Sequence, residues 1–159
     1  MMKKTNRILA LSLVVVMAVS MLVACGGKRE AITPDAFKTA AEAAGMTVEN
    51  ASDIYNDAIF TDAQLATHPD GWQVVFLTID TAEHAHEYFL IMKKFIEGQK
   101  TGAGSSQTTD KGSWAFYSQT NGGMFAYTSL VDNTMIYAAP AFADSYKDAM
   151  QAFIKSINY

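Results

Sequence analysis

The sequence predicts an α+β fold: an antiparallel sheet of four to six strands with amphipathic helices packed on it. Three observations predict this fold. Apolar residues recur every three to four positions in three segments, which is the period of an amphipathic helix. Alternating or apolar runs between those segments are typical of strands. Two turn sequences, Asn121-Gly122 and Asp132-Asn133, join the last three strands as hairpins, and hairpins make antiparallel sheets. Residues 33–159 are therefore expected to form a single α+β domain.

The first 24 residues have the pattern of a secretory signal peptide. Lys3, Lys4 and Arg7 form a basic start, and an uncharged apolar run follows from Ile8 to Val23. A permanent transmembrane helix needs roughly 20 apolar residues, so this run is marginal as a membrane span. It ends at the only cysteine of the chain, Cys25.

The four residues Leu22-Val23-Ala24-Cys25 resemble the lipobox of bacterial lipoproteins. The resemblance implies that residues 1–24 are removed and that a diacylglyceryl group is attached to the Cys25 thiol. Stable anchoring takes two acyl chains, so the protein would lie on the extracytoplasmic face of the cell membrane. Residues 25–32 would be the lipidated cysteine and a short tether, of which Gly26 to Ile32 reaches at most about 25 Å. The alternative is an uncleaved signal anchor with an incidental cysteine.

The first half of the domain contains a helix and three candidate strands. Thr33-Pro34-Asp35 has the residues of a helix start, and Gly45 suits a C-terminal cap with Met46 packing back onto the helix. Residues 46–51 and 64–67 are weak strand candidates, while residues 52–62 fit no element. The His68-Pro69-Asp70-Gly71 turn leads into residues 72–79, the strongest strand, which is apolar on both faces. The apolar face of the helix comprises Phe37, Ala40, Ala41 and Ala44.

A long helix and a glycine-rich loop follow. Asp80 or Thr81 is the predicted N-cap, Glu83 completes a capping box with Asp80, and the helix ends near Gly98. The glycine, serine and threonine residues within 100–110 are typical of a mobile loop. The Lys-Thr pair in this segment does not follow the spacing of a phosphate-binding loop. The predicted core side of the helix comprises Ala82, Ala85, Tyr88, Phe89, Met92, Phe95 and Ile96.

The second half predicts strands over residues 113–120, 123–131 and 134–139 and a helix over 141–157. An Asn121-Gly122 turn would pair Phe116 with Tyr127, and an Asp132-Asn133 turn would pair Leu130 with Met135. One sheet face then carries Trp114, Phe116, Phe125, Tyr127 and Ile136, and the last helix presents Phe142, Tyr146, Ala149, Met150, Phe153 and Ile157.

The opposite sheet face mixes tyrosine, methionine, small and polar residues, which is the composition of a recognition surface. Tyr117, Tyr137 and Met135 are therefore the candidate ligand-binding residues. The alternative is a second packed layer, covered by a helix or by residues 50–65.

Charge and composition exclude several classes of function. Removal of residues 1–24 takes away three of the twelve basic residues and none of the sixteen acids, which leaves a net charge of −7. Nucleic-acid binding needs clustered basic side chains, so it is not expected. We also expect no nucleotide, no cofactor and no disulfide.

Neither the histidines nor the acids form a recognisable metal site. His84 and His86 are two positions apart, so on a helix they point away from each other and cannot chelate one ion. Asn50, Asp53, Asn56, Asp57 and Asp62 are oxygen ligands that suit calcium, but their spacing matches no EF-hand loop. A solvated acidic loop is the simpler interpretation, and we expect no metal.

Three segments resemble a known family. ITPDAFKTAAEAAGMTVEN after the lipobox, VDNTMIYAAP, and a last helix that ends in FIKSINY are similar to small uncharacterised lipoproteins of Gram-positive, clostridial-type bacteria. The resemblance covers most of residues 25–159. It implies a membrane-anchored location and an α+β fold, and it implies no activity.

The expected function is that of a non-catalytic, lipid-anchored binding or interaction module. No G-x-S-x-G or S-x-x-K motif supplies a nucleophile. The expected partners are the membrane, through the N-terminal lipid, and an envelope protein or cell-wall component. The alternative is an accessory subunit or small-solute sensor of a transport or envelope-stress system.

Overall fold

The computed structural model describes residues 29–100, 103–141 and 144–159. In chain order its elements are α2 (Pro34–Ala43), β1 (Thr47–Asn50), β2 (Phe60–Thr67), β3 (Gln73–Ile79), α3 (Ala82–Gly98), β4 (Gly104–Asp110), β5 (Trp114–Asn121), β6 (Met124–Val131), β7 (Thr134–Ala141) and α4 (Asp144–Ser156). The predicted signal peptide, Cys25 and Phe142 lie outside the described residues.

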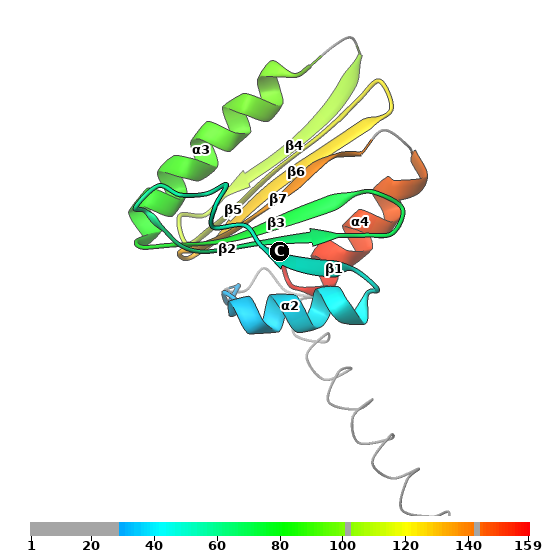
Figure 1. The fold of residues 1–159 in the computed structure, drawn as a ribbon. Coiled ribbons are helices and arrows are strands. Elements are labelled where there is room, and N and C mark those ends of the chain that lie inside the picture. The colour runs from blue at the N-terminus through cyan, green and yellow to red at the C-terminus, as the bar shows by residue number, and fades with distance from the viewer. Residues whose placement is uncertain (1–28, 101–102, 142–143) are drawn as a thin grey trace, which may run out of the picture.

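The chain forms three layers, which confirms the predicted α+β class. A seven-stranded antiparallel sheet, in the order β1-β2-β3-β7-β6-β5-β4, is the middle layer. α2 and α4 cover one face of the sheet, and α3 covers the other (Figure 1). None of the helices in the described ranges is long and apolar enough to span a bilayer.

The sheet has seven strands rather than four to six, because residues 104–110 form β4 instead of a loop. β4 has the sequence Gly-Ser-Ser-Gln-Thr-Thr-Asp and pairs with β5 along its whole length. Almost every residue of β4 is exposed, so it has no apolar face to alternate with a polar one. It is held by the backbone ladder to β5, and no hydrophobic period could have indicated it.

α2 begins and ends as its sequence predicts. The Thr33 side chain accepts a hydrogen bond from the Ala36 N–H (3.2 Å) and is the N-cap. At the other end Gly45 has a φ of +80°, and the Met46 N–H donates to the Ala41 carbonyl (3.0 Å). These contacts form the Schellman motif that a C-terminal glycine favours, and they bury Met46 beside Ala41.

The first turn of α3 has one of its two predicted N-caps but not the predicted capping box. Thr81 is the N-cap, and its side chain accepts from the His84 N–H. The Asp80 carboxylate instead contacts the His84 ring, so the capping box predicted between Asp80 and Glu83 does not form.

The structure confirms the predicted register of one hairpin and shifts the register of the other. Leu130 pairs with Met135 as predicted, around the Asp132-Asn133 turn. The other turn lies one residue later, at Gly122-Gly123, so Phe116 pairs with Ser129 rather than Tyr127. Gly122 and Gly123 both have a positive φ, as a type I′ hairpin turn requires. Sliding the turn by one residue changes each partner by two, so every side chain keeps its predicted face.

Two hydrophobic clusters lie on opposite faces of the sheet. The cluster under α2 and α4 includes the stacked pair Phe37 and Phe76, whose ring centroids are 4.8 Å apart. The cluster under α3 includes Leu77, Phe89 and Met135. Because both clusters share one central sheet, neither face of it is left open over its middle strands.

Candidate functional site

Two of the three predicted ligand-binding residues are buried. Met135 has no exposed surface and Tyr117 is 4 % exposed, both beneath α3. The prediction that they line an exposed recognition surface is therefore wrong, and the alternative of a second packed layer describes this face. Residues of this composition suit the interior here because their polar atoms bond to one another and to α3.

Gln119 shows how this face accommodates its polar groups. The Tyr117 hydroxyl donates to Gln119 Oε1 (2.9 Å), and Gln119 Nε2 donates to the Ile96 carbonyl at the end of α3 (3.1 Å). Both residues are buried. These hydrogen bonds fix α3 to β5, so Gln119 and Tyr117 hold the helix and are not available to a ligand.

Tyr137 lies at the edge of this layer and remains half-buried. It packs on the α3 cluster together with Tyr55, Phe60 and Tyr88. The Phe60 ring meets Tyr55 edge-on at 5.6 Å and Tyr88 edge-on at 5.0 Å. We call Tyr55, Tyr88 and Tyr137 the tyrosine cluster; its members come from the segment before β2, from α3 and from β7.

Burial raises the pKa of all three phenols in the tyrosine cluster. Partial desolvation is the largest cause in each case, and the neighbouring phenols add to it for Tyr88 and Tyr137. The phenols therefore stay protonated at neutral pH. None of the three hydroxyls makes a hydrogen bond to another residue in the described ranges, so each can donate to an incoming acceptor.

The tyrosine cluster combines aromatic surface with free hydroxyl donors. Tyrosines of this kind are enriched where one side of the ring is packed and the polar end is wet, as in protein interfaces.

The space between α3 and the sheet near Ile96, Gln119 and Asn121 has a volume of about 10 Å³, which is room for about one water molecule. This space is therefore too small to enclose a solute larger than water.

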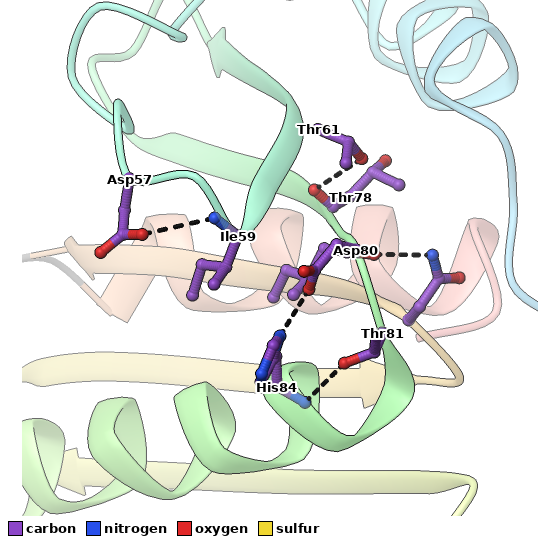
Figure 2. A network of polar contacts seen from close by, with 9 residues as sticks. Asp57, Ile59, Thr61, Thr78, Asp80, Thr81 and His84 are labelled. Atoms are coloured by element: carbon purple, nitrogen blue, oxygen red, sulfur yellow. Dashed lines mark hydrogen bonds and ion pairs between the residues drawn. The ribbon is translucent and has the colours of Figure 1, made fainter.

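A polar network connects the segment before β2 to the first turn of α3 (Figure 2). Asp57 accepts from the Ile59 N–H, and the Thr61 hydroxyl donates to the Thr78 carbonyl. His84 Nδ1 lies 2.7 Å from Asp80 Oδ1. The Asp80 hydrogen bond is the largest cause of the raised pKa of His84. The pair is exposed, and the Asp80 N–H donates to the Ile59 carbonyl (2.8 Å), which joins the start of α3 to the segment before β2.

The other histidines have separate partners. His86 Nε2 contacts Asp110 Oδ2 (2.9 Å), which links α3 to β4. The His68 ring stacks on Trp72, with centroids 4.7 Å apart, although the sequence indicated no partner for it. No three His, Cys, Asp or Glu side chains in the described ranges are grouped so that they could hold a metal ion. In the acidic segment, Asn50 accepts from the Ser52 N–H and so shapes a turn.

Sequence reasoning missed Tyr55 and Tyr88 as site residues. Tyr55 lies in the stretch that fitted no element, and Tyr88 was assigned to the core side of α3. A signal for Tyr88 exists: it lies at the border of the apolar stripe, where a tyrosine can bury its ring and expose its hydroxyl. No comparable signal exists for Tyr55, because its position depends on a segment without a period.

The comparisons with known proteins give no relative: the chain matches no protein-family model, no curated protein and no solved structure.

Proposed function

We propose that this chain is a lipid-anchored, non-catalytic interaction module on the extracytoplasmic face of the cell membrane. The tyrosine cluster binds an envelope protein or cell-wall component. The observation that carries the proposal is the position of the single cysteine, Cys25, at the end of an apolar run and within a lipobox-like sequence. The resemblance of three sequence segments to small lipoproteins of clostridial-type bacteria, stated above as an expectation, implies the same location.

The tether of such an anchor is short. Arg29 lies over the Trp114 ring, 4.4 Å from its centroid, and Ala31 and Ile32 pack on the α2–α4 cluster. The free tether therefore ends at Arg29 rather than at Ile32, and four residues from Cys25 span at most about 14 Å. A module held this close to the bilayer meets partners at the membrane surface.

Lipid attachment is tested by metabolic labelling of the full-length chain with palmitate. We expect label in the wild-type protein, none in Cys25→Ala, and normal label in Ser20→Ala, which lies outside the four-residue motif. The wild-type protein should also lack its first 24 residues by mass spectrometry. An unlabelled wild-type chain with an intact Met1 would contradict the anchor.

Partner binding is tested by cross-linking the anchored protein in intact membranes, followed by pull-down. A triple Tyr→Phe variant at positions 55, 88 and 137 keeps the rings and removes the hydroxyls, so we expect the captured partner to be reduced several-fold. Tyr146→Phe, on the opposite side of the sheet, is the matched control. Equal capture by all three proteins would rule out the tyrosine cluster as the binding surface.

The sensor or accessory-subunit alternative makes a different prediction. A small solute that binds the folded state raises the melting temperature of the protein in proportion to its concentration. Stabilisation by envelope solutes, with no protein captured, would favour that alternative over an interaction module.

A further inference from the structure

The outer side of α3 carries an exposed apolar patch. Leu90, Ile91 and Phe95 are 42 %, 59 % and 52 % exposed. Phe95 was expected in the core from its spacing, yet it lies outside. A groove of about 260 Å³, lined by Leu90, Ile91, Lys93, Lys94 and Glu97, runs along the same side of the helix. Exposed apolar side chains that are grouped in this way mark interaction sites.

The patch has a defined geometry on the helix. At about 100° per residue, Glu87 and Lys94 are two turns apart and point in nearly the same direction, away from the sheet. Leu90 and Ile91 lie between them along the helix, one on each side of the line that joins them. We call Glu87, Leu90, Ile91 and Lys94 the α3 outer face; all four are exposed.

The charges of this helix are divided between its two halves. Glu83 and Glu87 lie in the first half, and Lys94 lies in the second. The one acid in the second half of α3, Glu97, lies 4.0 Å from Lys93 and is partly neutralised by it. The outer face therefore changes from negative to positive along its length.

We propose that the α3 outer face binds the same face of a second copy of this chain, with the two helices antiparallel about a two-fold axis. An axis between Leu90 and Ile91 places Glu87 of each copy opposite Lys94 of the other. It also places Leu90 beside Leu90 of the other copy and Ile91 beside Ile91, because the axis keeps each of these residues on its own side of the interface. Two-fold interfaces require this kind of self-complementarity, and antiparallel helices also align their dipoles favourably.

The divided charge favours a second copy over an unlike partner. An acidic partner would complement Lys94 but repel Glu87, and a basic partner would do the reverse. The bilayer is also less suitable, because Arg29 and Trp114, from which the tether starts, pack on the α2–α4 side of the sheet, opposite α3. The tyrosine cluster remains on the flank of α3 in this arrangement.

One helix pair buries less area than a stable free dimer needs, so the isolated association is weak. Confinement to a membrane raises the effective concentration of the two copies. The strength of the association at the membrane therefore rests on the proposed lipid anchor, whereas the contact between the two α3 helices does not.

Cysteine cross-linking of the full-length protein tests the contact. Ile91→Cys lies beside the proposed two-fold axis, so mild oxidation should give a disulfide-linked dimer on a non-reducing gel. Ile54→Cys is the matched control, since Ile54 is an apolar side chain with 71 % exposure that is not part of the α3 outer face. We expect at least about fivefold more dimer from position 91 than from position 54 or from the wild type. Equal yields from positions 91 and 54 would overturn the proposal.

Charge exchange distinguishes a second copy from another partner. In the Ile91→Cys background, Glu87→Lys or Lys94→Glu alone creates like-charge contacts twice in the symmetric dimer, so cross-linking should fall about fivefold or more. The double exchange restores opposite charges and should restore the yield. Failure of the double exchange to restore it would overturn the self-complementary geometry.

The cross-linking experiment and the palmitate labelling experiment can succeed or fail independently of each other. Cross-linking from position 91 in purified protein with Cys25→Ala supports the dimer even where the palmitate experiment fails. Loss of cross-linking with normal palmitate labelling overturns the dimer alone.

Discussion

At the first turn of α3, the imidazole of His84 and the carboxylate of Asp80 form a contact whose strength can be measured. The Asp80 hydrogen bond, followed by its charge, raises the pKa of His84 above the ordinary value of 6.5. In Asp80→Asn we expect the His84 pKa to fall towards that value, as measured by titration of the ring protons by NMR. Asp110→Asn, which removes the partner of His86, should leave the His84 pKa in place.

The same contact gives a pH dependence of stability. A pKa that is higher in the folded state means that the folded protein binds the proton more tightly. The stabilisation by this pair is therefore complete below pH 6.5, the ordinary pKa, and is lost as the pH rises through the raised pKa of His84. The unfolding free energy of the wild type should decline slightly over this range. An equal decline in Asp80→Asn would contradict this origin.

Gln119 is a buried residue whose replacement has a larger expected cost. Gln119→Leu leaves the buried Tyr117 hydroxyl without its acceptor and removes one of the two donors to the Ile96 carbonyl, which still accepts from the Gln99 N–H. An unsatisfied buried polar group costs about 1–3 kcal/mol, so urea denaturation should show a loss of that order. Adding Tyr117→Phe removes the orphaned hydroxyl and should recover part of the loss.

Gln107→Leu is the control for this pair, because Gln107 is exposed on β4 and its replacement should change stability by less than about 0.5 kcal/mol. If Gln119→Leu behaved like Gln107→Leu, the hydrogen bonds of Gln119 would not be holding α3.

At the scale of single residues, the sequence predicts which face of the sheet each side chain takes, since alternation fixes the face. It does not predict whether that face is covered. Tyr117 and Tyr137 share a face two strands apart, yet one lies under α3 and the other at its edge. The difference depends on where α3 crosses the sheet, which no local pattern encodes.

Among the elements, β4 depends most on backbone contacts. Gly104 lies so close to β5 that a Cβ atom there would be 2.2 Å from the Thr120 carbonyl oxygen. Gly104→Ala should therefore push the start of β4 away from β5, with a loss of about 1–3 kcal/mol or local fraying of β4. Hydrogen exchange should show lost protection in β4 amides and retained protection in β6.

Gly98→Ala is the matched control for that substitution. A Cβ atom at Gly98 meets nothing within 4 Å, and Gly98 is the last residue of α3. Alanine is the better helix former by roughly 0.5–1 kcal/mol, so this variant should be as stable as the wild type or more so. Equal effects of the two alanines would show that the close approach at Gly104 is unimportant.

Elements with their own sequence signals could be predicted, and elements without them could not. The Thr33 cap, the Gly45 stop and the Asp132-Asn133 turn each follow from a residue type with a local physical preference. β4 lacks apolar residues, and the β5–β6 hairpin contains two overlapping turn sequences, Asn121-Gly122 and Gly122-Gly123. In that hairpin the register was decided by pairing along the whole of β5 and β6.

For the molecule as a whole, the shared sheet determines how the two hydrophobic clusters respond to unfolding. The α2–α4 cluster uses one face of strands β3, β6 and β7, and the α3 cluster uses the other face of the same strands. Loss of either helix layer exposes a face of these strands to water. The two layers are therefore expected to unfold together, as small single sheets with two covered faces do.

Phe89→Ala tests this coupling. Phe89 is 1 % exposed in the α3 cluster, so its removal should cost about 3–5 kcal/mol. Trp72 and Trp114 both lie on the α2–α4 side and report the opposite cluster. Fluorescence and far-UV circular dichroism should therefore shift to the same lower urea midpoint in this variant, while Ile54→Ala, at an exposed position, should shift neither. A drop in helical signal at lower urea than the tryptophan transition would mean that α3 detaches on its own and that the sheet does not couple its two faces.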